Sequence, residues 1–342
     1  LGGHFRLFEG NTLTAGGDLD FVHVTTRIRN ATGGVVETTA YGPSSSDVDE
    51  TNFSLYLQDD WLFCNDQFEL VLGARLDSYE AFGEEISPKA AFIWHYMDDG
   101  RFKLSAGRAY RAPDINERLN PPWTMFPGRT RISNPDLDPE RVVSYEISFE
   151  NEFFDKRVST RITPFLSYAE DFIDSITYTP DPATGTGSLQ TDINAGDVDI
   201  QGVEAEVKVH IIDPLHAFAN YQYSETKDSD TDVLLDNHPQ NRVNAGLTWY
   251  SRHFDDFVGL GAGVSWHFVD EQKYTGWTTL LPGKLDPYDW WDAHASVDFW
   301  KRRIALTADV FNVFDNHGNT QRDDTWYPER NWMLGAELRL EF

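Results

Sequence analysis

The feature that most constrains this chain is an alternation of apolar and polar residues with a period of two. At the C-terminus, apolar side chains occupy every second position from Trp332 to Phe342, and Gly335, Glu337 and Arg339 lie between them. This period places all the apolar side chains on one face of a β-strand. The same pattern recurs at 69–77, 143–150, 202–209 and 291–299. We count roughly fifteen such strands and no amphipathic helix, which predicts an all-β protein.

The connections between the predicted strands are alternately short and long. Short turns are expected near residues 64–67, 97–100, 151–155, 211–214, 252–256 and 301–302. Long segments are expected near residues 27–51, 80–85, 111–140, 169–199, 225–240, 270–289 and 314–330. An antiparallel up-and-down transmembrane β-barrel has this layout, with short periplasmic turns and long extracellular loops. Aromatic residues near strand ends agree with the interfacial girdles of such a barrel, at Tyr110, Trp249, Trp300 and Trp332.

Composition excludes several other classes of protein. The chain has 56 acidic and 28 Lys and Arg residues, a net charge of −28. Nucleic acid is therefore not expected as a partner, because its phosphates require a basic surface. The single cysteine, Cys64, excludes an intrachain disulfide and a multi-cysteine metal site. A soluble sandwich or propeller also alternates, but neither explains the segregation of long from short connections.

The sequence has no clear catalytic motif and only one weak candidate for a metal-binding motif. We find no zinc-protease, nucleophile-elbow or Walker sequence, so no enzyme activity or catalytic residue is predicted. The run from Asp228 to Asp232 resembles the start of a calcium loop, but Val233 stands at the position that needs glycine. A looser extracellular calcium site remains an alternative to a solvated acidic loop, and no resident cofactor is expected.

Several segments, in order, resemble the barrel of TonB-dependent outer-membrane receptors. They are LYLQDDW (55–61), GARLD (73–77), ISPKAA (86–91), SAGRAYRAPDINERL (105–119), NPDLDPERVVSYEISFE (134–150), DFIDSI (171–176), INAGDVDIQGVEAEV (193–207), HPQNRVNAGLTW (238–249), DVFNVFDN (309–316) and RNWMLGAELRLEF (330–342). Each segment is weak alone, but together they cover most of the chain from about residue 52 onward.

The resemblance implies a location in the bacterial outer membrane and a set of partners. Receptors of this family have an N-terminal plug, a segment that engages the TonB–ExbB–ExbD energy-transducing complex, and about 22 strands. We therefore expect residues 1–342 to be a C-terminal part of the barrel, about 15 of 22 strands, without the plug or the TonB-engaging segment. We expect outer-membrane lipid to contact the outside of the barrel. Leu338, Leu340 and Phe342 resemble the signal for the barrel-assembly machinery, although ordinary edge hydrophobicity explains them equally.

The implied function is TonB-dependent transport of a scarce large solute of the ferric siderophore or cobalamin class. Cationic and aromatic residues in the predicted loops and at one strand end are candidates for ligand binding, because Arg holds anionic groups and aromatic rings stack on flat ligands. These candidates are Arg108, Arg111, Trp123, Arg129, Tyr274, Trp277 and Trp326. Packing within the loops is the alternative role for each. The alternative function is that of a soluble, secreted, β-rich carbohydrate-binding or adhesion protein.

Overall fold

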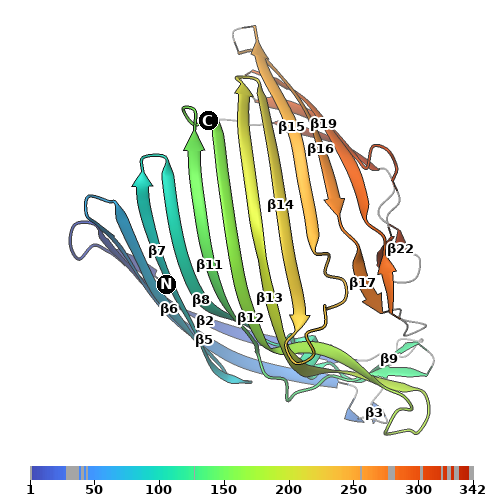
Figure 1. Ribbon diagram of the computed structural model, residues 1–342. Coiled ribbons are helices and arrows are strands. Elements are labelled where there is room, and N and C mark those ends of the chain that lie inside the picture. The colour runs from blue at the N-terminus through green and yellow to red at the C-terminus, as the bar shows by residue number, and fades with distance from the viewer. Residues whose placement is uncertain are drawn as a thin grey trace.

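The strands follow one another around a curved antiparallel sheet (Figure 1). This computed structural model describes residues 2–27, 38–39, 42–43, 45–126, 128–254, 256–275, 282–300, 303–316, 319–321, 325–326 and 331–338. The main sheet has 17 strands, and two of them, β9 (Trp123–Phe126) and β10 (Arg129–Arg131), lie inside one long loop. The other fifteen form the wall, which confirms the predicted number and the all-β class.

The wall strands alternate in direction along the chain. They are β1 (Gly2–Phe5), β2 (Asn11–Arg27), β5 (Ser45–Phe63), β6 (Phe68–Tyr79), β7 (Gly83–Met97), β8 (Gly100–Arg111), β11 (Glu140–Phe153), β12 (Val158–Tyr178), β13 (Ser188–Ile212), β14 (Leu215–Asp228), β15 (Asn241–His253), β16 (Val258–Val269), β19 (Tyr288–Phe299), β20 (Ile304–Phe311) and β23 (Asn331–Leu338). Three pairs in the loops form separate ribbons: β3 (Thr38–Thr39) with β4 (Gly42–Pro43), β17 (Gln272–Thr275) with β18 (Pro282–Leu285), and β21 (Asn319–Gln321) with β22 (Thr325–Trp326). In the part of the chain described, no pairing joins β1 to β23, so the sheet is open between these edges.

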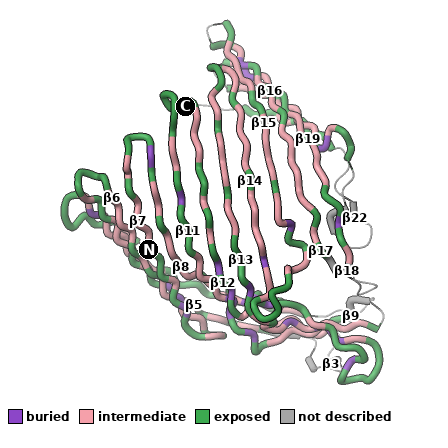
Figure 2. Tube along the Cα trace, in the orientation of Figure 1, coloured by how far each residue is buried: buried purple, intermediate pink, exposed green. Residues whose placement is uncertain are grey.

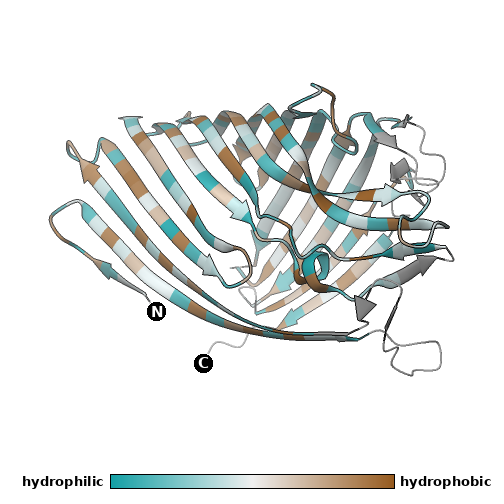
Figure 3. Ribbon diagram, turned by 90° about the horizontal axis from the view of Figure 1, so that it is seen from below, coloured by the Kyte–Doolittle hydropathy of each residue, from teal (hydrophilic) through white to brown (hydrophobic). Residues whose placement is uncertain are grey.

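The alternation in the sequence places one apolar face along the whole wall. Leu72 on β6 pairs with Ala90 on β7, and Leu104 on β8 pairs with Ile147 on β11. Leu72 and Leu104 remain exposed, and so do many other large apolar side chains of this register. Figure 3 shows the resulting banding of apolar and polar residues along the strands. In an outer-membrane barrel this apolar face contacts lipid and the polar face lines the interior.

Aromatic rings gather where the strands meet the short turns. Phe8, Trp61, Phe63 and Phe68 form successive contacts with centroid separations of 5.2–6.1 Å. Trp300 packs edge-on against Phe257 at 5.9 Å, as expected for a girdle residue. The Tyr110 ring lies edge-on to Tyr79 with centroids 6.0 Å apart, and its hydroxyl donates to the Tyr79 hydroxyl at 2.9 Å, so a girdle role for Tyr110 stays a prediction.

Two predicted long loops are shorter than expected. The β6–β7 connection is only residues 80–82, and much of the segment 169–199 belongs to β12 and β13, which are 21 and 25 residues long. A membrane crossing needs only about 10 residues, so these two strands continue well beyond the apolar band. There the strands no longer face lipid, and buried apolar residues such as Ile173 and Leu189 lie beside buried polar ones such as Asp192. The regular apolar–polar alternation of a lipid-facing strand is therefore lost.

The loop between β8 and β11 contains a helix that the sequence pattern did not predict. Helix α1 (Ile115–Leu119) is a single turn, too short to show a 3.6-residue period. A capping box starts it: the Asp114 carboxylate accepts from the Asn116 amide at 2.7 Å, and the Glu117 carboxylate accepts from the Asp114 amide at 2.6 Å.

Buried apolar residues are few and are concentrated near the extracellular end (Figure 2). They are Leu137, Ala169, Ile173, Leu189, Val198 and Leu285. All but Leu285 belong to the β8–β11 loop and to the extensions of β12 and β13. The packed core of the described structure therefore lies mainly at the rim of the sheet, where it supports the candidate site.

Candidate functional site at the rim and inner wall

Residues 112–139, the connection from β8 to β11, form a strap along the extracellular rim. At one end, the Arg118 guanidinium of α1 is 2.9 Å from the Glu50 carboxylate of β5, and Arg118 is only 6% exposed. The guanidinium also lies 5.6 Å from the centre of the Phe82 ring. Since Phe82 belongs to the short β6–β7 connection, the strap reaches across that hairpin to β5.

The other end of the strap pairs with the start of β13. Strand β10 runs parallel to Ser188–Gln190 of β13, the one parallel pairing among the described strands. The Arg131 guanidinium is 2.6 Å from the Asp192 carboxylate, which is only 3% exposed. The Arg129 guanidinium donates to the Gln190 side chain at 3.0 Å and to the Thr177 hydroxyl at 3.3 Å.

Asn194 on β13 joins three of the sequence segments that resemble the receptor family. Its amide group donates to the backbone carbonyls of Asp138 at 3.0 Å and Asp171 at 2.8 Å. Its side-chain oxygen accepts from the Asp138 amide at 3.0 Å. The segments at 134–150, 171–176 and 193–207 therefore meet here, and their shared role is to fasten the strap to the wall.

The candidate ligand residues Arg108 and Arg111 are engaged by carboxylates at the rim. Arg111 donates to Glu140 and lies 3.3 Å from Glu117 of α1. Arg108 is 3.4 Å from Glu85, whose other oxygen is 2.6 Å from the Arg141 guanidinium. Glu85 is 3% exposed, so one buried carboxylate contacts two arginines, and Arg141 also lies 2.7 Å from the Asp171 carboxylate. Carboxylates of the chain itself therefore pair with both guanidinium groups. Ligand binding by Arg108 and Arg111 stays a prediction.

The remaining candidates are spread over several loops. Trp123 lies on β9 opposite Arg131 and is 40% exposed. Tyr274 is on β17, and Trp326 is on β22 opposite Asn319. Trp277 lies outside the described residues. The structure therefore places Trp123 and Arg129 in the strap and Arg111 in contact with Glu117 of the strap, whereas Arg108 contacts Glu85 of β7. Tyr274 and Trp326 belong to the separate ribbons β17–β18 and β21–β22.

The acidic turn after β14 uses its carboxylates internally. The Asp228 carboxylate accepts from the Thr231 amide and hydroxyl at 2.7 and 2.6 Å, and these bonds lower the pKa of Asp228. Lys227 is 3.1 Å from Asp232, and this hydrogen-bonded contact raises the pKa of the lysine. No cluster of three or more His, Cys, Asp or Glu side chains suited to a metal occurs in the described ranges. A loop calcium site stays a prediction.

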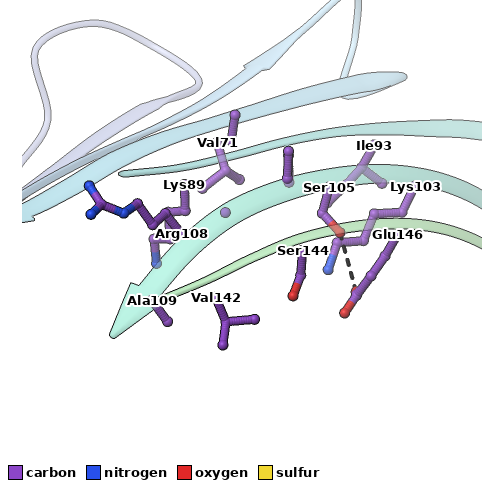
Figure 4. A pocket seen from close by; sticks show the side chains of 14 residues that line it. Val71, Lys89, Ile93, Lys103, Ser105, Arg108, Ala109, Val142, Ser144 and Glu146 are labelled. Atoms are coloured by element: carbon purple, nitrogen blue, oxygen red, sulfur yellow. Dashed lines mark hydrogen bonds between the residues drawn. The ribbon is translucent and has the colours of Figure 1, made fainter. Parts of the chain in front are cut away.

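A trough on the polar face of the wall contains two lysines that the sequence analysis did not single out. It measures about 430 Å³ and is lined by β6, β7, β8 and β11. Lys89 faces Gly73 on one neighbouring strand and Gly107 on the other. Figure 4 shows Lys89, Lys103 and Ser105 around this trough, with Ser105 donating to Glu146 at 3.3 Å. In the sequence, Lys89 could have been found as a single lysine among small residues in the segment 86–91.

Histidine–aspartate pairs occupy a different part of the polar face. His267 lies 3.2 Å from Asp292, and His294 lies 2.6 Å from Asp309. The His267 ring also stacks on Trp290, with centroids 4.7 Å apart and planes inclined by 14°. The two histidines and two aspartates line a hollow of about 510 Å³ that extends from β14 to β20. The inner wall therefore has a cationic sector and a separate sector of imidazole, carboxylate and aromatic groups.

The wall has one polar face and one apolar face, which is the architecture of an outer-membrane β-barrel. No helix among the described residues is long and apolar enough to span a membrane. The model of the family described as "TonB dependent receptor-like, beta-barrel" matches residues 1–313. The chain belongs to the TonB-dependent receptor β-barrel family. Its location is the bacterial outer membrane, and the predicted resemblance is confirmed.

Relatives of this receptor chain include proteins named for iron. The iron-regulated outer membrane virulence protein of Vibrio cholerae serotype O1 is 25% identical over 309 residues, which cover 86% of this chain and 45% of that protein. This chain thus spans less than half the length of that relative.

Solved structures of TonB-dependent receptors share the fold. A ferric enterobactin receptor of Pseudomonas aeruginosa gives a TM-score of 0.72 at 21% identity, covering 97% of this chain and 52% of that one. The siderophore receptor PirA of Acinetobacter baumannii gives 0.70 at 17% identity, covering 96% and 52%.

The predicted assembly signal of this receptor is only partly described. Leu338 ends β23, pairs with Ile304 and is 64% exposed in the apolar register. Leu340 and Phe342 lie outside the described residues. Recognition by the barrel-assembly machinery therefore stays a prediction.

Proposed function

We propose that the protein takes part in TonB-dependent uptake of a ferric siderophore across the outer membrane. The observation that carries the proposal is membership of the receptor family together with a relative named as iron-regulated. The polar-lined wall and the strap at its rim support it, because an uptake receptor needs a hydrated interior and a shaped extracellular mouth. Cobalamin has no comparable support, and the soluble carbohydrate-binding alternative is not favoured for a member of this family.

The proposal requires partners beyond the present sequence. Energy would come from the TonB–ExbB–ExbD complex through a plug and a TonB-engaging segment, which the resemblance implies for the whole receptor. The gene upstream of Leu1 should then encode both. An in-frame signal peptide placed directly before Leu1, with no plug between them, would contradict the proposal.

Uptake by cells tests the function itself. Cells with and without the gene are supplied with radioactive iron as ferric tris-catecholate, tricarboxylate or trihydroxamate chelates, and with labelled cobalamin in parallel. We expect gene-dependent uptake of at least one iron chelate, abolished by deletion of tonB. Uptake of cobalamin alone would reassign the substrate, and no gene-dependent uptake of any compound would overturn the proposal.

A further inference from the structure

The apolar face of the wall contains a hollow that is larger than the two described on the polar face. This outer hollow measures about 780 Å³ and extends across the strands from β6 to β14. Most of its lining side chains are apolar and lie in the register that faces lipid: Leu70 pairs with Phe92, and Phe92 pairs with Leu104. A volume of this size is typical of sites that hold a small molecule.

Two alanines form a notch in the outer hollow. Ala90 and Ala106 lie opposite each other on β7 and β8, with Leu72 beyond one of them and Tyr145 beyond the other. Leu72 and Tyr145 are each 49% exposed, so they project on either side of two methyl groups. The notch therefore follows from the residue types in one row of the register.

The outer hollow has one polar end. Beyond Tyr145 the same row continues through Leu166 to Gln201 on β13, whose amide donates to the Glu225 carboxylate on β14 at 2.8 Å. The Tyr145 hydroxyl has no hydrogen-bond partner among the residues that the structure describes. Water is absent at membrane depth, so a polar atom of an occupant would satisfy this hydroxyl.

The orientation of the outer hollow matches that of a lipid molecule. Leu70 is the second residue after Phe68, where β6 leaves a short periplasmic turn, whereas Tyr223 is the eighth residue after Leu215, where β14 leaves another. The row therefore descends from β14 to β6. Its polar end lies toward the extracellular side, and its apolar length continues toward the periplasmic side.

We propose that the outer hollow binds an acyl chain of an outer-leaflet membrane lipid, whose ester or amide carbonyl accepts a hydrogen bond from Tyr145. The family places this face in the outer membrane, where lipid chains surround it. Lipid tails are as apolar as the wall, so retention comes from van der Waals packing in the Ala90–Ala106 notch and from the hydrogen bond. The site is on the opposite face from the barrel interior and does not depend on the transported substrate.

The test measures lipid binding by the protein produced from its natural gene and stripped of lipid in detergent. The probes are dimyristoyl phosphatidylethanolamine and its dialkyl ether analogue, which lacks both carbonyl groups. Ala90→Leu with Ala106→Leu fills the notch, and Tyr145→Phe removes only the hydroxyl. Ala74→Leu is the matched control, because Ala74 is exposed in the same register and does not line the hollow. Native mass spectrometry gives the ratio of lipid-bound to free protein, and thermal unfolding checks the fold.

We expect the wild type to bind the ester lipid about fivefold more tightly than the ether analogue, the effect of one neutral hydrogen bond. Tyr145→Phe should abolish this preference. The double leucine variant should bind both lipids about tenfold more weakly, because overfilling a packed site is costly. Ala74→Leu should match the wild type. If the double variant unfolds, the ester preference in Tyr145→Phe decides the question alone.

Three results would overturn the inference. Equal binding by the wild type and the double variant would indicate only the general lipid surroundings of a barrel. An ester preference that survives Tyr145→Phe would remove the hydrogen bond. A receptor dimer that the leucine substitutions dissociate would assign this face to a second copy of the chain. None of these results bears on the uptake experiment, so the proposed function stands or falls separately.

Discussion

The rim and the inner-wall trough use cationic side chains in opposite ways. At the rim, Arg118, Arg131 and Arg141 each contact a carboxylate that is almost fully buried, and the contacts hold the strap and its neighbouring strands together. In the trough, Lys89 and Lys103 lie among small residues with no such partner in the described part of the chain. The same positive charge therefore holds elements together in one region and has no ion-pair partner among the described residues in the other. Positive charge alone does not distinguish these roles.

Among variants that test this comparison, Glu85→Gln should cause the largest loss of stability. The change leaves the Arg108 and Arg141 guanidiniums without their shared buried anion, and loss of one partner of a buried pair costs about 3 kcal/mol. Thermal unfolding in detergent measures it. The control is Glu84→Gln, because Glu84 is the exposed neighbour on the same strand. Equal unfolding temperatures for the two variants would show that the rim pairs are no more important than surface charges.

A smaller loss of stability is expected from Asn194→Ala. This change removes three hydrogen bonds that join β13 to the strap and to β12. We expect about 2 kcal/mol of destabilisation, concentrated in the strap. Amide hydrogen exchange should increase at residues 134–139 before it does so in β15 or β16. Asn220→Ala is the control, because the buried Asn220 side-chain oxygen has no hydrogen-bond partner among the described residues. Uniform exchange across the wall would contradict a fastening role.

The trough lysines should have almost no effect on stability. Lys89→Gln and Lys103→Gln should each change the free energy of unfolding by less than about 0.5 kcal/mol, because neither charge has an ion-pair partner to lose among the described residues. Chemical denaturation of the purified protein checks this value. A loss as large as that of Glu85→Gln would remove the distinction between rim and trough.

The smallest effect concerns an exposed pair at the extracellular end of β2. Hydrogen bonding to Asp49 and its charge, with the charge of Asp47, raise the pKa of His23 above its ordinary value of 6.5. Because the folded-state pKa is the higher one, this contribution is complete below pH 6.5 and is lost as the pH rises through the raised value. The histidine signal in NMR should titrate above 6.5 in the wild type, and Asp49→Asn should lower its midpoint. A midpoint unaffected by Asp49→Asn would contradict the pairing.

The sequence predicted the membrane-spanning part of the wall well, because a lipid-facing strand must alternate. Leu70, Leu72, Ala74 and Leu76 lie in the apolar register as expected. The sequence analysis mistook the extensions of β12 and β13 for a loop, because these segments mix buried apolar and buried polar residues and do not alternate like a lipid-facing strand. Helix α1 depends on a capping box formed within a loop, which a search for helical periodicity does not detect.

For the candidate site, the sequence identified cationic and aromatic residues but not their partners. Arg111 and Glu140 are distant along the chain, and only the pairing of β8 with β11 places them opposite one another. Lys89 was overlooked for the same reason. Its isolation depends on Gly73 and Gly107 from two neighbouring strands, which the register brings beside it.

The strap also has a mechanical consequence. By linking Glu50 of β5 to Asp192 and Asn194 of β13, it acts as a brace that fixes the separation of these strands at the mouth. Strands β6 to β12 therefore lie within the braced arc of the rim, and strands β14 to β23 lie outside it. Within the braced arc, a change in the separation of β5 and β13 at the mouth would require these contacts of the strap to break.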